Sequence, residues 1–401
     1  MSTSPALPQG ETVPPLPDGV ARDPADSPGT AHTAGRRALP NLLVVMATAA
    51  LGLLSAAGAL PFTAADLMRF ALGMVVGLNI FFLGYRLLGR FSGLAEVWTS
   101  IGVGRRLGGT VRRGRLLTFR LLPLIVVNTC QVVVDRPGLR RRMWWGTALT
   151  LLAEALSGAA LIAAGGSAAA IGWGVAALTV MLVTVQPGRV TSPAWRLLRL
   201  PFGREDQRLA EWVHDPASLA AARAATAGRI DLARAALDAA EPSGSARRQA
   251  MTAVVALAEG RCDDAARTAA ALRERSVSPE LRRGALQLYA SALADGIAAG
   301  HWSRADALPA FSAALAALRA ESPAAALRGT DLAAMEALFG ARPREAEKLA
   351  SLAVAMAPDN LSRARALLTL AAAHTVAGRP ALAGPLRAEA AALSPSLRTV
   401  R

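Results

Sequence analysis

Four stretches of this chain are almost entirely apolar, and each reaches or approaches the roughly 20 residues that a helix needs to cross a bilayer. They cover residues 41–60, 67–88, 143–164 and 168–185. Only residues 61–66 separate the first two stretches, and only residues 165–167 separate the last two. The pattern predicts two helical hairpins, and thus four transmembrane helices in a domain that covers residues 41–205.

The segment between the two hairpins has a different pattern. Residues 116–134 are apolar, but Arg120, Pro123, Asn128 and Gln131 interrupt them. An unpaired strand edge is not stable in hydrocarbon, so we expect short strands that form a small interfacial β element packed on the helices. A fifth transmembrane helix is the alternative, and it would move the C-terminal half to the other side of the membrane.

Alanine-rich helical sequence fills residues 206–401, and Gly, Pro and Ser break it at regular intervals. Residues 340–346 and 377–383 superimpose at an offset of 37 residues. A looser form, a glycine followed five residues later by an alanine, recurs at Gly228/Ala233, Gly260/Ala265 and Gly300/Ala305. This pattern resembles tetratricopeptide repeats, and it predicts about five helical pairs stacked into an α-α solenoid. The expected fold is an all-α membrane protein with a cytoplasmic solenoid.

Charge and composition locate the ends of the chain. Residues 1–40 contain eight prolines and no hydrophobic periodicity, which predicts a disordered tail. The net charge is +15, and residues 86–142 hold 12 arginines against Glu96 and Asp135, a local excess of +10. Arginines collect on the cytoplasmic side of membrane helices and bind anionic lipid there. We therefore expect a multi-pass protein of a bacterial cell membrane, with both termini cytoplasmic and no nucleic-acid partner.

The order of short motifs along the membrane domain points to a family. The second apolar stretch contains Phe81-Phe-Leu-Gly-Tyr85, a glycine-rich basic loop follows, then Arg120-Leu-Leu-Pro123, and then the third stretch. This order resembles the core of the site-two family of intramembrane zinc proteases over about residues 67–200. That family has His-Glu-Leu-Gly-His in the helix, a basic glycine-rich loop and an Arg-Leu-Leu-Pro strand.

The resemblance implies that the catalytic groups have been lost. In the family, two histidines one turn apart bind zinc, and the glutamate between them is the general base. Phe81 and Tyr85 stand at the ligand positions and Phe82 at the position of the base, while the third ligand, an aspartate, falls near Pro193. No histidine lies between residues 33 and 213. We expect no metal, no cofactor and no enzymatic activity.

Two polar residues in the predicted spans are candidate site residues. Glu154 is the only ionisable residue well inside a span, and an intramembrane carboxyl group is a functional candidate by default. Asn79 is a possible neighbour of it. The alternative role for Glu154 is a hydrogen bond between helices with no further function.

The sequence is compatible with several functions. The first is an inactive site-two-like protein, a pseudoprotease, that binds a membrane client or a protein partner through its membrane core and its helical repeats. The second is a plain membrane-anchored repeat scaffold, for which the long basic loop would have no use. An active protease with unconventional ligands is the third, and a small transporter or channel around Glu154 and Asn79 is the fourth.

Overall fold

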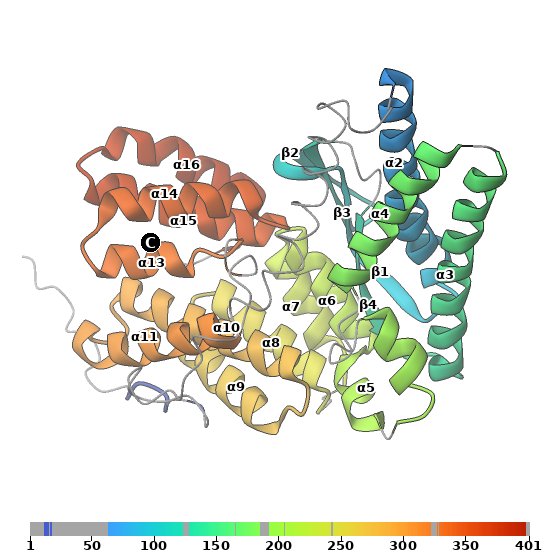
Figure 1. The fold of residues 1–401 in the computed structure, drawn as a ribbon. Helices are drawn as coiled ribbons and strands as arrows, with labels where there is room; N and C mark the ends of the chain where they lie inside the picture. Colours follow the sequence, from blue (N-terminus) through green and yellow to red (C-terminus); the bar gives the residue numbers. More distant parts are fainter. Residues whose placement is uncertain are drawn as a thin grey trace, which may run out of the picture. The chain divides into compact units, whose positions relative to one another are not determined.

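We analysed the chain in a computed structural model that describes residues 12–15, 17, 63–122, 128–164, 166–184, 192–203, 205–241, 244–321, 327 and 329–397. The protein is mostly helical, about 70%, with one small sheet (Figure 1). It divides into two compact units: residues 29–219, here called the sheet unit, and residues 1–28 with 220–401, here called the repeat unit. Each unit is described separately.

Among its described residues, the sheet unit has three long helices and two short ones. Their bounds are α2 Ala64–Gly89, α3 Leu139–Ala163, α4 Ser167–Thr184, the π-helix η2 Trp195–Arg199 and α5 Asp206–Trp212. Two segments, Met68–Gly89 and Leu139–Ala163, are long and apolar enough to cross a membrane. They match the second and third predicted spans. The first predicted span lies outside the described residues, and α4 is a helix over the fourth.

Small residues let these helices approach one another closely. A Cβ added to Gly73 in α2 would lie 1.9 Å from the carbonyl oxygen of Ala169 in α4, and one added to Gly172 would lie 2.0 Å from that of Phe70. A Cβ on Gly84 would lie 2.9 Å from the Thr150 side chain of α3. Contacts of this kind are typical of helices that associate in lipid, where small residues allow the backbones to pack.

The loop between α2 and α3 folds into a sheet. Its strands are β1 Leu94–Ile101, β2 Val103–Arg112, β3 Arg115–Leu122 and β4 Asn128–Val134, and Val213–His214 adds β5. The order is β2-β3-β1-β4-β5, with β1 parallel to β3 and antiparallel to β4. The described parts of the segment 116–134, residues 116–122 and 128–134, therefore form strands and not a fifth helix, although the sheet is larger than the β element that we expected.

Part of the positive charge of the loop has a structural role. Glu96 in β1 is buried and pairs with Arg86 at 3.3 Å and with Arg115 at 2.9 Å. Arg120 donates hydrogen bonds to Ser100 Oγ at 3.0 Å and to the Gly104 carbonyl at 2.7 Å. These arginines stabilise the sheet. The two that pair with Glu96 offset the free-energy cost of burying its carboxylate.

The repeat unit consists of helical pairs. Its helices are α6 Pro216–Thr226, which crosses the boundary between the units, α7 Ile230–Asp238, α8 Ala246–Ala258, α9 Cys262–Arg275, α10 Pro279–Ala299, α11 Arg304–Glu321, α13 Leu332–Phe339, α14 Pro343–Met356, α15 Asn360–Val376 and α16 Pro380–Leu393. The turns within pairs occur where the repeat pattern predicts them. Gly228, Gly260, Gly300 and Gly378 have positive φ there, and Ala341 has φ 55° at the equivalent place.

The repeated alanines pack in the helix interfaces, with one exception. Ala233, Ala265, Ala346 and Ala383 are fully buried. Ala305, which the pattern predicts as the equivalent residue, is exposed, and Ala307 is buried instead. The expectation for Ala305 was therefore wrong, because two extra residues follow the turn at Gly300 and shift the buried position along α11.

The repeat unit also differs from an open solenoid, in which each repeat contacts only its neighbours. Asn360 at the start of α15 donates to the Ala227 carbonyl at 3.1 Å, and Ser394 after α16 donates to the Gly228 carbonyl at 3.0 Å. Inside the unit, Arg365 of α15 pairs with the buried Asp295 of α10 at 2.8 Å. The last helical pair therefore packs on the first turn, and the unit closes on itself.

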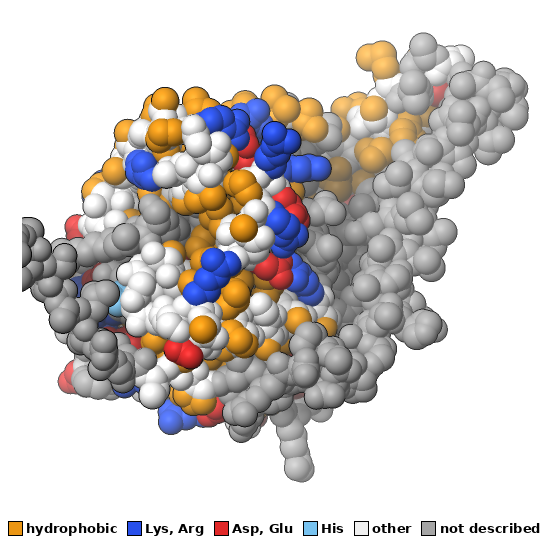
Figure 2. Space-filling view, turned by 90° about the vertical axis from the view of Figure 1, so that its left-hand side faces the viewer, with side chains coloured by type: hydrophobic (Ala, Val, Ile, Leu, Met, Phe, Trp, Pro, Cys, Tyr) orange, Lys and Arg blue, Asp and Glu red, His pale blue; other side chains and the backbone are white. Residues whose placement is uncertain are grey.

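The surface of the structure is charged but mixed in sign. Figure 2 shows one face, on which basic and acidic side chains lie side by side with apolar ones between them. The repeat unit contains ion pairs such as Arg363–Glu389 and Arg342–Glu345. Exposed pairs of this kind contribute little to stability.

Candidate functional site

The motif residues of α2 lie on the face that packs against the other helices of the sheet unit. Gly77, Phe81 and Gly84 are spaced by about one turn, so they share this face. Phe81 is only 5% exposed, and its ring centroid lies 4.9 Å from that of Tyr85. Phe82 makes an edge contact with Phe81 at 5.6 Å and is half-buried. Phe81 is therefore an interior residue and not a lipid-facing one.

The chain segment after α4 returns to this motif. Arg196, in η2, places its guanidinium carbon 5.4 Å from the centroid of the Tyr85 ring, within range of a cation–π interaction. The side chain of Arg196 is buried, and burial lowers its pKa, an effect that Tyr85 partly offsets. Pro193 is buried one helical turn before Arg196. The structure thus brings Tyr85 close to the segment that contains the predicted third-ligand position.

Packing and a hydrogen bond hold that segment in place. Trp195 is fully buried in a cluster with Met143 of α3 and Leu94 of β1, and Tyr85 packs against the same cluster. Trp144 of α3 donates from Nε1 to the Leu197 carbonyl at 3.2 Å. Arg196 is therefore fixed beside Tyr85 by the packing of the sheet and of α3.

Glu154 occupies the most unusual polar position in the sheet unit. Its side chain is 6% exposed, and neither carboxylate oxygen has a hydrogen-bond partner among the described residues. The buried hydroxyls on the same face of α3, those of Thr147 and Thr150, instead donate to carbonyls of their own helix. The indole of Trp173 lies close enough to Glu154 to interact electrostatically, but no hydrogen bond of normal geometry joins them. An unpaired buried carboxyl group is costly, so it marks a candidate site.

Asn79, the second predicted polar residue, does not share this position. A Cβ on Gly77 would lie 3.3 Å from Glu154 Oε1, so the Gly77 side of α2 faces the carboxyl group. Two residues along an α-helix correspond to a rotation of about 200°, which places Asn79 on a different side. Its amide donates to the Val75 carbonyl at 2.8 Å. No hydrogen bond joins Asn79 to the Glu154 carboxylate in the part of the chain that the structure describes.

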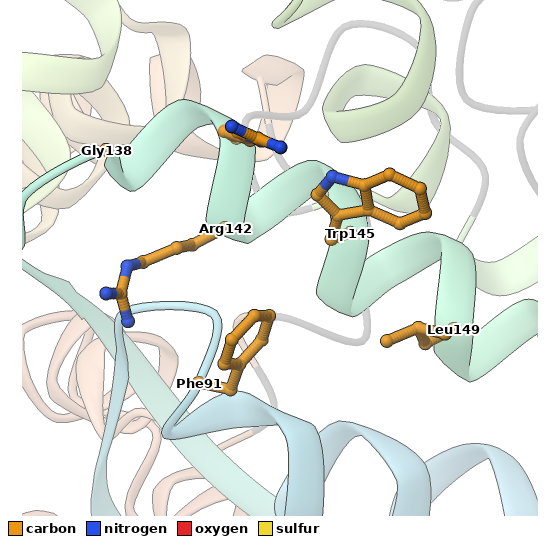
Figure 3. A pocket seen from close by; sticks show the side chains of 6 residues that line it. Phe91, Gly138, Arg142, Trp145 and Leu149 are labelled. Carbon is orange, nitrogen blue, oxygen red and sulfur yellow. The ribbon is translucent and has the colours of Figure 1, made fainter.

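A surface hollow of about 440 Å³ lies at the start of α3 (Figure 3). Its lining comprises Phe91, Gly138, Arg141, Arg142, Trp145 and Leu149. The guanidinium of Arg142 lies 5.6 Å from the Phe91 ring centroid, and its Nε donates to the Pro137 carbonyl at 3.0 Å. Trp145 and Leu149 project from α3 farther along the hollow. Arginines above an apolar, aromatic floor suit the headgroup zone of a membrane.

Sequence reasoning missed Arg196 and Trp173 as members of the site. Arg196 is one of several arginines that follow the fourth predicted span. Arginines are common beside membrane helices, so the sequence does not distinguish Arg196 from the others. In the part of the chain that the structure describes, no three His, Cys, Asp or Glu side chains cluster as they would to hold a metal ion.

Comparison with known proteins identifies no relative: no family model, no curated protein and no solved structure matches this chain.

Proposed function

We propose that this protein is a catalytically inactive, site-two-protease-like membrane protein that binds a membrane client or a protein partner. The observation that carries this proposal is the contact between Arg196 and Tyr85. A metalloprotease of that family needs the third-ligand segment beside the motif helix, and here that segment lies beside it. In this proposal, the buried guanidinium over the tyrosine ring takes the place of the family's metal and imidazole ligand, and a cation there repels Zn²⁺.

Exposure of the apolar helices supports the membrane part of the proposal. Large apolar side chains on α2 and α3 are exposed, including Met68, Leu72, Leu87, Leu152, Leu156 and Ile162. Apolar surface of this extent is rare on soluble monomers and marks contact with lipid or protein. The helices span the membrane in this proposal, with the repeat unit and both termini in the cytoplasm.

The β2–β3 hairpin supports anionic lipid as a second partner. Its exposed apolar side chains are Leu107, Leu121 and Leu122, and the arginines Arg112 and Arg113 are exposed at the turn end of the hairpin. Apolar residues enter the interface while arginines meet lipid phosphates, at about 1 kcal/mol for each cation near an anionic surface.

Glu154 provides the contact with the client. Glu154 is buried, so a client reaches it by displacing part of the helix packing around it; a transmembrane client that then presents a hydrogen-bond donor at this depth satisfies a carboxyl group that lacks a partner among the described residues. Such bonds contribute about 0.6–2 kcal/mol in membranes, which corresponds to about a 3- to 30-fold change in affinity.

The test measures energy transfer in liposomes between the labelled full-length chain and model polyleucine transmembrane peptides. A peptide with one central asparagine should bind the chain about 3- to 30-fold more tightly than the all-leucine peptide. Glu154→Leu should remove that difference, whereas Ser157→Leu, one turn away on α3, should preserve it. Equal binding of both peptides to the native chain would refute client recognition at Glu154 and favour the plain anchor.

A further inference from the structure

Part of the proline-rich N-terminal tail is docked on the repeat unit. Residues 12–15 and Pro17 are described in a non-helical conformation. Val13 packs against the largest hydrophobic cluster of the unit, which includes Tyr289 of α10 and Phe311 of α11. The Tyr289 hydroxyl donates to the Pro14 carbonyl at 2.8 Å and approaches the Pro15 carbonyl at 3.2 Å. The remainder of the predicted disordered tail lies outside the described residues.

Two buried prolines of this segment are three residues apart. Pro14 and Pro17 are buried, whereas Pro15 between them is exposed. A polyproline II helix has three residues per turn, so Pro14 and Pro17 lie on one side of it and Pro15 on another. Proline has no N–H donor, and the carbonyls of such a segment need donors from elsewhere. The tail therefore presents one apolar edge and a pair of acceptor carbonyls to the repeat unit.

The repeat unit supplies complementary chemistry. Tyr289 is fully buried, and its hydroxyl is the donor that both carbonyls meet. Burial raises the pKa of Tyr289 to about 12, so the hydroxyl remains a proton donor at physiological pH. Without the tail, this hydroxyl would lose both acceptors, and the part of the apolar cluster that Val13 contacts would be exposed to solvent. Recognition of an extended proline segment by an aromatic surface with a hydroxyl donor is an established mode of peptide binding.

We propose that residues 12–17 are a tethered, displaceable ligand of the repeat unit, which holds closed a site around Tyr289 that recognises extended proline-rich peptides of the same pattern. This inference rests on the proposed function only in that the repeat unit binds a protein partner. A partner competes with the tail for the site if it contains a segment with the pattern of residues 13–17. That pattern is an apolar residue, a proline, any two residues and a second proline. The site is therefore closed in the resting chain and opens when such a partner is abundant.

The strength of this closure follows from the tether. A ligand in the same chain as its site has an effective concentration that the connecting residues set, taken as about 1 mM. For a segment that binds the open site with a dissociation constant of about 100 µM, the closed state outnumbers the open state by about tenfold. An added peptide then binds the native chain about tenfold more weakly than it binds a chain whose tail has left the site.

The experiment measures fluorescence anisotropy of a labelled peptide with the sequence of residues 8–21, titrated with the full-length protein in detergent. Pro14→Asp places a charge on the buried edge and releases the tail, whereas Pro15→Asp makes the same change at the exposed neighbour. We expect Pro14→Asp to bind the peptide about tenfold more tightly than the native chain, and Pro15→Asp to match the native chain. Deletion of residues 1–17 serves as a second open variant.

A further substitution locates the binding site. Adding Tyr289→Phe to the Pro14→Asp variant removes the donor and should weaken peptide binding about 5- to 10-fold, with the helical circular dichroism unchanged. Two results would overturn the proposal. One is that neither open variant binds the peptide more tightly than the native chain does. The other is that Tyr289→Phe leaves the peptide affinity of the Pro14→Asp variant unchanged. Neither result depends on Glu154, so the failure of this inference and the failure of the proposed function are distinguishable.

Discussion

The closure of the repeat unit makes a sharp prediction at Gly228. This glycine has φ 81°, and a Cβ added to it would lie 2.0 Å from the Leu393 carbonyl oxygen at the end of α16. Gly378 has φ 75° in the equivalent turn of the last pair, yet a Cβ there meets nothing within 4 Å. The two glycines share the same backbone conformation and differ in whether the turn contacts a distant part of the chain.

The magnitude of the effect follows from this comparison. Alanine at either position incurs about 1–2 kcal/mol for the left-handed conformation. Gly228→Ala also forces α16 away from the first turn, which adds about 1–3 kcal/mol of overpacking strain. It also weakens the bond from Ser394 to the Gly228 carbonyl, worth about 1 kcal/mol. We therefore expect Gly228→Ala to be less stable than Gly378→Ala by about 2 kcal/mol or more.

The assay is thermal unfolding followed by far-ultraviolet circular dichroism, on both variants in the same detergent. For a unit of this size, 2 kcal/mol corresponds to about 4–8 °C in Tm. Hydrogen exchange of the amides in α16 should also increase in Gly228→Ala and remain native in Gly378→Ala, because only the first variant breaks the closing contact. Equal Tm values for the two variants would refute the closed arrangement and restore the open solenoid.

Two further predictions concern local conformation and ionisation in the repeat unit. Ala341 has φ 55° where the other turns carry glycine, so Ala341→Gly should stabilise the protein by about 0.5–1 kcal/mol in urea unfolding. Ala377→Gly, at an ordinary φ of −76°, should bring no gain, and a gain there would contradict the strain at Ala341. Tyr289 has a pKa that burial raises from 10 to about 12, so its contribution to stability is complete below pH 10 and is lost as the pH rises towards 12. Tyr289→Phe should remove that loss between pH 10 and 12, and an unchanged alkaline profile would disprove the burial of this hydroxyl.

The sequence predicted those features of the fold that depend on local pattern. The bounds of α2 and α3 agree with the apolar stretches to within a few residues, because length and composition determine such helices. The turns at Gly228, Gly260 and Gly300 were also predictable, because the left-handed conformation that they adopt favours glycine over every other residue.

Features that depend on long-range contact were not predictable. β5, at Val213–His214, pairs with β4, whose last residue precedes it by about 80 positions, and no local pattern marks so short a strand. The contact of Arg196 with Tyr85 depends on how η2 packs. The docked tail has neither helical nor strand periodicity, and the spacing of Pro14 and Pro17 becomes meaningful only once Tyr289 is known to lie against the tail.

The central claim is that the sheet unit retains the scaffold of a metalloprotease whose ligands have been lost, and zinc binding tests it most directly. Zinc content would be measured by elemental analysis of the detergent-purified native chain and of a variant with Phe81→His, Phe82→Glu, Tyr85→His and Pro193→Asp. We expect none in the native chain and about one equivalent in the variant, bound more tightly once Arg196→Gln removes the competing cation. Stoichiometric zinc in the native chain, or no zinc in the variant with or without Arg196→Gln, would contradict the claim.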